Sequence, residues 1–284
     1  MNAILAGKYA ALQERLRRLG SCVVAFSGGV DSALLLRVAV GTLRRDKVLA
    51  ITGRSPSVPS ADLDSAAALA SEIGAPHEFL ATAEFDDPAY VANPTNRCYF
   101  CKTELYTRLS RLATERGFNA VLSGTNADDL GDFRPGLQAA VEHNVYAPLA
   151  DAGIGKAELR ALAAELGLSV HDKPASPCLS SRIPYGEEVT PEKLGRIDAA
   201  ETFLRGLGFR ECRVRHHDKL ARIEVPPADL ARFSDAELRG RIDARLRELG
   251  FQYVALDLRG FRTGSLNEVL VGRRLGTPPK RRPS

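Results

Sequence analysis

The stretch from Cys22 to Ser32, which reads CVVAFSGGVDS, constrains the fold of this chain more than any other. Its first half is apolar and rich in valine, which is typical of a buried strand in a parallel sheet. Gly28 and Gly29 then allow a tight turn, and Asp31 and Ser32 stand where a helix with periodic apolar residues begins. Because the loop amides and the first N–H groups of that helix point at one spot, the stretch predicts an anion-binding loop.

The loop belongs to neither of the two commonest phosphate-binding types. The stretch contains neither the GxxxxGK[ST] pattern nor GxGxxG. Its SGGVDS part, residues 27–32, resembles the pyrophosphate loop (PP-loop) of the ATP pyrophosphatases. Those enzymes cleave ATP between the α and β phosphates, release pyrophosphate and place AMP on a substrate oxygen. The resemblance implies that ATP binds here; the alternative interpretation is a glycine turn that only reverses the chain.

Strands and helices alternate along most of the chain. This pattern predicts right-handed βαβ units in an α/β fold, with a doubly wound, mostly parallel sheet and a second, smaller α+β domain. The strands are expected at 22–26, 48–52, 77–80, 120–123, 212–216, 221–225 and 253–258, and helices at 4–18, 60–73, 156–166, 192–204 and 235–249 with Ser60 as a helix cap. The predicted organisation is a PP-loop domain at 1–170, a cysteine-bearing interdomain segment at 171–190, an α+β substrate-binding domain at 191–276 and a disordered tail at 277–284.

Four loops should meet at the carboxyl ends of the strands, which is where open α/β sheets bind ligands. They are residues 27–32, 53–59, 83–98 and 124–134. The nucleotide ligands expected there are Ser27, Gly28, Gly29, Asp31, Ser32, Arg54, Ser55, Gly124, Thr125, Asn126 and Asp129.

Acidic residues in these loops suit Mg²⁺, which would offset the charge of the departing pyrophosphate. Asp129, with Asp128 beside it, is the expected Mg²⁺ ligand, and Asp31 is expected to take part in catalysis. The alternative for the Asp128 and Asp129 pair is capping of the next helix. Asp31 can likewise act as a helix N-cap.

The five cysteines point to metal or sulfur chemistry rather than to a disulfide framework. Cys98 and Cys101 form a CxxC pair, and Cys178 lies far along the chain. From the residues alone, half a zinc site, a redox pair, part of an iron–sulfur site and bare thiols all stay open. Three thiolates with no evident fourth suit a [4Fe–4S] cluster that keeps one iron open for an external sulfide. Cys22 and Cys212 lie within predicted strands and are expected to be buried spectators.

Four stretches together carry a closer resemblance. They are SGGVDS, GTNADDLGDFRPG from Gly124, SPCLSSRIPYGEEVT from Ser176 and RVRHH from Arg213. Together they are similar to the LarE family of ATP-dependent sulfur insertases, which mature the nickel-pincer nucleotide of lactate racemase; the likeness spans residues 5 to 272. It implies that a carboxylate of pyridinium-3,5-biscarboxylic acid mononucleotide is activated as an acyl-adenylate and that sulfur then enters to give a thiocarboxylate.

The family has two variants, which differ in the source of sulfur. One variant sacrifices the sulfur of a single cysteine, which matches Cys178, and is left with dehydroalanine. The other uses three cysteines, which match Cys98, Cys101 and Cys178, to hold a [4Fe–4S] cluster whose extra sulfide is transferred. Because this chain has all three, the cluster variant is expected, with the Cys178 sulfur as the alternative source.

The substrate that the resemblance implies carries a phosphate and carboxylates, which call for forked cationic donors. Arg213 and Arg215 alternate with a valine and so share one face of their predicted strand. With Arg182 they are expected to clamp the substrate phosphate, Glu201 is expected to orient one of these arginines, and Ser181 to bind a substrate oxygen. The alternative for the arginines is a solvated surface.

Charge and hydropathy bear on partners and location. The net charge is +4, and part of the excess lies in the terminal PPKRRPS, so composition does not favour nucleic acid as a partner. No apolar run approaches the ~20 residues of a membrane span, and no leader pattern opens the chain, so a cytoplasmic protein without membrane contact is expected. The family resemblance implies a homo-oligomer, for which a hexamer is one form.

Three other functions stay open. A transfer-RNA thiolase of the same superfamily is expected to show a broad basic face, and an amide-forming synthetase has no need of the three cysteines. A protein of another class, a non-catalytic adaptor that binds ATP and an Fe–S cluster or zinc, would form neither AMP nor pyrophosphate.

Overall fold

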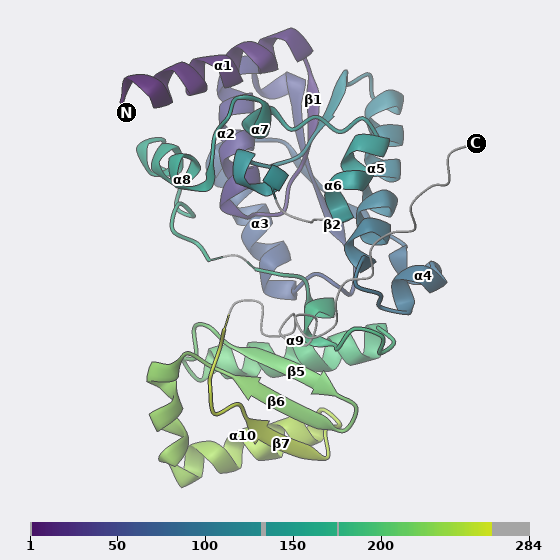
Figure 1. The fold of residues 1–284 in the computed structure, drawn as a ribbon, viewed down its shortest axis with the longest axis vertical. Coiled ribbons are helices and arrows are strands. Elements are labelled where there is room, and N and C mark those ends of the chain that lie inside the picture. Colours follow the sequence, from purple (N-terminus) through teal and green to yellow (C-terminus); the bar gives the residue numbers. More distant parts are fainter. Residues whose placement is uncertain (1, 132–134, 175, 263–284) are drawn as a thin grey trace, which may run out of the picture. The chain divides into compact units, whose positions relative to one another are not determined.

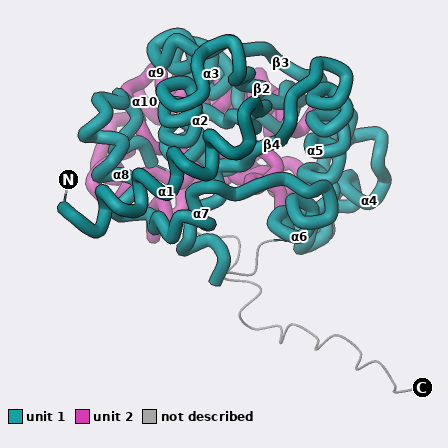
Figure 2. The backbone as a smooth tube through the Cα atoms, turned by 90° about the horizontal axis from the view of Figure 1, so that it is seen from above, with its two compact units in different colours: residues 1–178, 185–191 teal, residues 179–184, 192–284 magenta. Residues whose placement is uncertain are grey.

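The chain folds as two compact units, which are described here from a computed structural model of residues 2–131, 135–174 and 176–262 (Figures 1 and 2). Unit 1 contains the described residues within Met1–Cys178 and Tyr185–Pro191, and unit 2 those within Leu179–Pro184 and Glu192–Ser284. The segment 171–190, which the sequence predicts as an interdomain piece, therefore divides between the units. The predicted tail at 277–284 lies outside the described residues.

Unit 1 is built on a parallel sheet of four strands, in the order β3-β2-β1-β4. The strands are β1 (Cys22–Ala25), β2 (Val48–Arg54), β3 (His77–Ala81) and β4 (Ala120–Leu122). Cys22 in the central strand pairs with Val48 on one side and with Ala120 on the other. The parallel pairing confirms the α/β fold predicted from the alternation of strands and helices.

Helices cover both faces of this sheet (Figure 1). The α-helices are α1 (Ala3–Leu19), α2 (Val30–Leu43), α3 (Ser60–Ile73), α4 (Pro88–Val91), α5 (Arg97–Glu115), α6 (Pro135–Glu142), α7 (Pro148–Asp151) and α8 (Lys156–Glu165), and the 3₁₀ turns are η1 (Arg45–Lys47), η2 (Glu84–Asp86) and η3 (Ala127–Gly131). Among the described residues, no helix combines the length and the hydropathy that crossing a bilayer requires.

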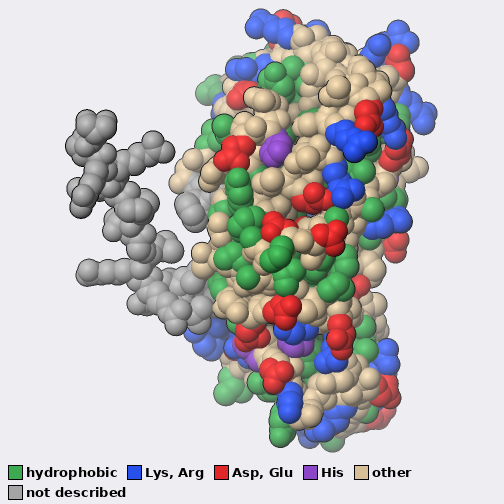
Figure 3. All heavy atoms as spheres, turned by 90° about the vertical axis from the view of Figure 1, so that its right-hand side faces the viewer, with side chains coloured by type: hydrophobic (Ala, Val, Ile, Leu, Met, Phe, Trp, Pro, Cys, Tyr) green, Lys and Arg blue, Asp and Glu red, His purple; other side chains and the backbone are tan. Residues whose placement is uncertain are grey.

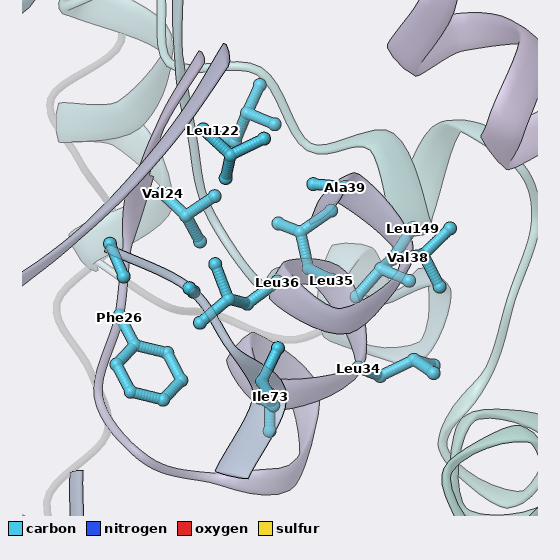
Figure 4. Packing of buried hydrophobic residues seen from close by; sticks show 14 of the residues in the cluster. Val24, Phe26, Leu34, Leu35, Leu36, Val38, Ala39, Ile73, Leu122 and Leu149 are labelled. Carbon is cyan, nitrogen blue, oxygen red and sulfur yellow. The ribbon is translucent and has the colours of Figure 1, made fainter. Parts of the chain in front are cut away.

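The period of two along the strands divides the core of unit 1 into two layers. Val24 packs with α1, α2, α3 and α8 on one face, and its neighbour Val23 packs with α5 and α6 on the other. Figure 4 shows Val24 and Leu122 of the sheet facing Leu36 of α2. Leu36 is fully buried, so its truncation to alanine should cost about 2–5 kcal/mol. This packing fixes the helix that follows the PP-loop.

Two helix starts differ from the prediction. Gly29, not Asp31, is the N-cap of α2, so the interpretation of Asp31 as a cap is wrong; Asp31 lies in the first turn. Ser60 is the first residue of α3 rather than its cap. Pro59 takes the cap position with φ −54°, and its carbonyl accepts the first hydrogen bonds of α3 from the amides of Asp62 and Leu63.

Unit 2 is a small α+β unit with its own core. Its strands β5 (Arg213–His217), β6 (Leu220–Glu224) and β7 (Tyr253–Leu256) form a sheet in that order, antiparallel between β5 and β6 and parallel between β6 and β7. Its helices are α9 (Pro191–Gly206) and α10 (Ala236–Glu248), with 3₁₀ turns η4 (Leu179–Arg182) and η5 (Pro227–Ser234). Phe209, Ile223 and Leu246 lie in the buried cluster between the sheet and the helices.

Candidate active site

The PP-loop is held together by its own two serines. Ser32 Oγ donates to the carbonyl of Gly29 at 3.0 Å and accepts from the amide of Ser27 at 3.2 Å. Gly28 has φ +70°, and a Cβ there would lie 3.1 Å from Cα of Ala66 in α3. The turn therefore needs glycine for its backbone angle and for its close approach to α3.

The fourth predicted loop packs directly against the start of α2. A Cβ on Gly124 would lie 2.8 Å from the amide nitrogen of Ser32, closer than any side chain allows. Beyond Gly124, Thr125 shares a hydrogen bond with Ser123 at 3.0 Å between their hydroxyl oxygens. Residues 132–134 of this loop lie outside the described residues.

The acidic residues near the loop already have partners within unit 1. Lys156 Nζ lies 2.5 Å from Asp31 Oδ1. Asp128 Oδ2 accepts from the amide of Lys156, the first residue of α8, at 2.8 Å, so its contact is with a helix farther along the chain rather than with the next one. Asp129 Oδ2 accepts from the amide of Asn126 at 3.1 Å, and the Asp129 side chain is buried.

A cavity of about 310 Å³ opens at the carboxyl ends of β1 and β2, within the size range of small-molecule sites. It brings Ser27 of the PP-loop together with Cys98 and Cys101 at the start of α5 and with Cys178. Its lining also includes Phe26, Ile51, Thr52, Gly53, Ser55, Ser57, Val58, Pro59, Asp62, Thr82, Glu84, Tyr90, Arg97, Lys102, Leu105 and Ser176.

The three thiols of the cavity form no disulfide and differ in their surroundings. Cys98 is exposed, while Cys101 and Cys178 are partly buried. Burial raises the pKa of Cys101 to about 12, and the charge of Glu84 acts in the same direction. Cys22 and Cys212 are fully buried in the two cores, where burial likewise raises the pKa of each thiol to about 12.

Metal binding depends on how closely these thiols gather. Among the described residues, no three His, Cys, Asp or Glu side chains converge closely enough to hold a single metal ion. The thiols of Cys98, Cys101 and Cys178 all line one cavity. Cysteine thiolates are the usual ligands of iron–sulfur clusters, so these three side chains are the ones that would hold such a cluster.

Three residues of the cavity were missed by the sequence reasoning. Arg97 and Lys102 flank the CxxC pair on α5, and this adjacency was the signal available for them. Glu84 carried no such signal. Its Oε1 accepts from Ser55 Oγ at 2.5 Å and from Ser57 Oγ at 3.0 Å, and its carboxylate is buried through these contacts. Its Oε2 has no hydrogen-bond partner among the described residues.

The chain around Cys178 is fastened to unit 1 on both sides. Asp62 of α3 accepts from Ser176 Oγ at 2.7 Å and lies 3.6 Å from Lys173 Nζ. Further on, the amide of Gly186 donates to the carbonyl of Asn93 at 2.9 Å. These contacts hold the Cys178 segment at the cavity.

Other predicted nucleotide ligands lie at the same end of the sheet. Arg54 ends β2, and its guanidinium lies 4.2 Å from the ring centre of Phe79. Ser55 faces the cavity through its bond to Glu84. The flat face of the Arg54 guanidinium thus lies against Phe79 of β3. Its N–H groups point along the plane of the guanidinium, which is the direction from which a phosphate would bind.

In unit 2, two of the predicted substrate arginines form buried ion pairs. Arg182 is 1% exposed and donates to both carboxylate oxygens of Glu201, at 2.9 and 3.0 Å. Arg215 donates to Glu224 at 2.7 Å and to the carbonyl of Ser181 at 2.9 Å. Glu201 also accepts from the amide of Val214, so these pairs join β5 to η4 and α9.

Arg213 differs from its two neighbours. It is partly buried, its guanidinium lies 5.1 Å from the ring centre of Phe261, and no carboxylate of the described residues lies within ion-pair distance. Burial lowers the pKa of Arg213, and the positive charges of Arg182 and Arg215 lower it further. A desolvated cation beside two others favours an anionic ligand.

Comparison with known proteins identifies relatives of both the PP-loop region and the whole chain. A family model described as asparagine synthase matches residues 9–132, the part that contains the PP-loop. A pyridinium-3,5-bisthiocarboxylic acid mononucleotide synthase from Lactiplantibacillus plantarum is 40% identical over 275 residues, 97% of this chain and 99% of that protein. The chain belongs to the LarE family.

Two uncharacterised proteins extend the family. One from Synechocystis is 47% identical over 268 residues, 94% of this chain and 100% of that protein. Another, from Methanocaldococcus jannaschii, is 31% identical over 241 residues, 85% of this chain and 90% of that protein. As expected of the LarE family, the chain is an ATP-dependent enzyme with a PP-loop.

Proposed function

We propose that this chain makes the thiocarboxylate of pyridinium-3,5-biscarboxylic acid mononucleotide by ATP-dependent sulfur insertion. The observation that carries the proposal is the cavity, which joins the start of the PP-loop to the thiols of Cys98, Cys101 and Cys178. The likeness to the Lactiplantibacillus synthase over nearly the whole chain supports the choice of substrate.

The first half-reaction is activation of a carboxylate. A carboxylate is a poor acyl donor because its leaving group would be oxide, and transfer of AMP to its oxygen supplies a better one. The PP-loop, with Ser27, Gly28, Gly29 and Ser32, is proposed to hold the phosphates through its amides and hydroxyls. Asp129 and Asp31 are the proposed Mg²⁺ ligands, because Mg²⁺ prefers oxygen atoms and both side chains end in carboxylates.

The second half-reaction needs a sulfur donor within reach of the activated acyl group. Cys98, Cys101 and Cys178 are proposed to hold a [4Fe–4S] cluster, which when bound supplies a transferable sulfide. The choice of residues is supported by the three thiols that line one cavity and form no disulfide. The alternative is that Cys178 gives up its own sulfur in a single turnover, which leaves Cys98 and Cys101 without a role.

Unit 2 is proposed to bind the substrate phosphate. Arg213 has no carboxylate of the described residues within ion-pair distance, and Arg182 and Arg215 add to the positive potential around it. Glu201 holds Arg182, and Ser181 lies beside both Arg182 and Arg215. This arrangement supports roles for Arg182 and Arg215 as fixed charges and for Arg213 as the direct ligand.

The setting of the enzyme is proposed from the family. It is expected to act as a homo-oligomer in the cytoplasm, in the maturation of the nickel-pincer nucleotide of lactate racemase. Five cysteines without a disulfide among them suit a reducing compartment. On the face drawn in Figure 3, basic side chains of the described residues are interspersed with acidic ones rather than gathered into one patch, which does not favour a transfer-RNA thiolase.

The deciding experiment starts from chain purified anaerobically and reconstituted with iron and sulfide. Incubation with ATP, Mg²⁺ and the dicarboxylated nucleotide should give AMP, pyrophosphate and the thiocarboxylate in repeated turnovers, followed by mass spectrometry. Replacing Cys98 or Cys101 with alanine should abolish iron binding and repeated turnover, whereas Cys212→Ala is the control.

Each alternative gives a different result. Product equal to one sulfur per chain, with dehydroalanine at position 178, would select the sacrificial variant. AMP formed only with transfer RNA or with ammonia would select a thiolase or a synthetase. No AMP with any substrate would leave the non-catalytic adaptor.

A further inference from the structure

Arg97 is a buried cation placed between two of the three thiols. It is the first residue of α5 and is 4% exposed. Its Nη2 lies 4.0 Å from Cys178 Sγ, across 81 residues of chain. Cys98 is its immediate neighbour in the chain and lines the same cavity. The guanidinium therefore faces sulfur from two separate segments.

A rigid scaffold holds Arg97 from the side. Its Nη1 donates to Oδ1 of Asn93, which is fully buried and has φ +54°, in the left-handed region. The carbonyl of the same Asn93 accepts from the amide of Gly186. The hydrogen bond to Asn93 fixes the position of the Arg97 guanidinium. An exposed lysine or arginine side chain would instead sample many rotamers.

Burial of a guanidinium is costly unless negative charge lies near. The Nη2 atom of the buried Arg97 lies 4.0 Å from Cys178 Sγ. Because little water surrounds a buried guanidinium, its positive charge acts more strongly on this sulfur than a surface charge would.

We propose that Arg97 is a positioning residue that holds the sulfur of Cys178 at the cavity and keeps a fixed positive charge beside it. Its contribution to sulfur insertion rests on the proposed function, whereas its contact with Cys178 and the local charge do not. Arg97 contacts the Cys178 sulfur both if that cysteine binds a cluster and if it donates its own sulfur.

The local charge can be measured at Cys178 on the iron-free chain. Iodoacetate is an anion and iodoacetamide is neutral, so the ratio of their alkylation rates at one cysteine reports the charge around it. Peptide mass spectrometry separates Cys178 from the other cysteines. We expect the ratio at Cys178 to exceed that of a synthetic peptide of residues 176–181, and Arg97→Gln to lower it about fivefold, the scale of one partly screened charge.

Two further variants separate charge from structure. Arg97→Lys keeps the charge and should hold the ratio within about twofold of the wild type. Arg111→Gln removes an exposed arginine from the same helix, where it pairs with Glu115, and should leave the ratio unchanged. Circular dichroism checks that each variant is folded.

A wild-type ratio equal to that of the peptide would overturn the proposal, and this comparison needs no variant to fold. An unchanged ratio in folded Arg97→Gln would overturn it as well. The proposed function fails separately, if the reconstituted wild type forms no thiocarboxylate while the ratio at Cys178 responds to Arg97 as expected.

Discussion

The ammonium group of Lys156 lies 2.5 Å from Oδ1 of Asp31 and ties the N-terminus of α8 to the first turn of the PP-loop helix α2. A lysine from α8, far along the chain, thus lies beside the PP-loop, whose own sequence has no lysine. Both side chains are partly exposed, so the pair should add little to stability, on the order of 0–1 kcal/mol. Its position beside the anion loop points to a role in ATP binding.

Asp31→Asn should therefore separate catalysis from folding. The unfolding free energy should stay within about 1 kcal/mol of the wild type. AMP formation should fall by roughly a hundredfold, because the variant would lose a carboxylate proposed to hold Mg²⁺ at the transferring phosphate. Pyrophosphate release measures the activity and urea unfolding the stability. The control is Asp46→Asn, which changes an exposed aspartate beside Arg44. Wild-type activity in Asp31→Asn would show that Asp31 has no catalytic role.

Gly124→Ala should weaken both the fold and ATP binding. The added Cβ would lie 2.8 Å from the amide nitrogen of Ser32 and 3.0 Å from the carbonyl carbon of Asp31, and backbone atoms cannot yield as a flexible side chain does. We expect a loss of about 1–3 kcal/mol in unfolding free energy and a higher KM for ATP.

Gly41→Ala is the matched control. It lies inside α2 with nothing within 4 Å of its added Cβ, and alanine there should raise stability by about 1 kcal/mol. Equal effects of the two substitutions would contradict the packing of Gly124 against the PP-loop.

Arg182→Met and Arg213→Gln should act on different properties of unit 2. Arg182→Met leaves the Glu201 carboxylate, which is fully buried, without its bidentate partner, and this should cost about 3–5 kcal/mol. Arg213→Gln should change stability by less than about 1 kcal/mol while raising the KM for the nucleotide substrate. Unfolding curves and substrate titrations test the contrast. A stable Arg182→Met chain with weakened substrate binding would make Arg182 the direct ligand instead.

The stability of unit 2 should fall in mild acid because of His216. This residue is 2% exposed, and neither ring nitrogen has a hydrogen-bond partner among the described residues. Burial lowers the pKa of His216, the nearby charges of Lys193, Arg196 and His217 lower it further, and Asp218 opposes them. Burial likewise lowers the pKa of His217.

A lowered pKa in the folded state means that the unfolded chain binds the proton more tightly. The stability is therefore complete above the unfolded value of about 6.5 and is lost as the pH falls from there towards the folded pKa. Urea unfolding at pH 7.5 and 5.5 measures the loss. His216→Phe should reduce it, and His171→Gln, at an exposed histidine, should not. An equal loss in all three proteins would exclude His216 as the cause.

Several features could be predicted from local patterns. Neighbouring residues alone were enough to predict the valine-rich strand, the glycine turn and the helix that follows. The structure confirms that order in β1 and α2. The alternation of strands and helices likewise predicted the parallel sheet. Burial of Cys22 and Cys212 was predicted from their places in expected strands, and both are buried, although Cys212 lies one residue before β5. The roles proposed for the thiols stay predictions.

The sequence by itself determined the PP-loop and the layered α/β fold, because each depends on short-range spacing. Only the tertiary structure decided which groups meet: Lys156 with Asp31 across 125 residues, Arg97 with Cys178 across 81, and Arg182 as the arginine that Glu201 holds through both carboxylate oxygens. Such contacts have no local signature, since they depend on where separate elements end in space, and burial then decides which charges must be paired.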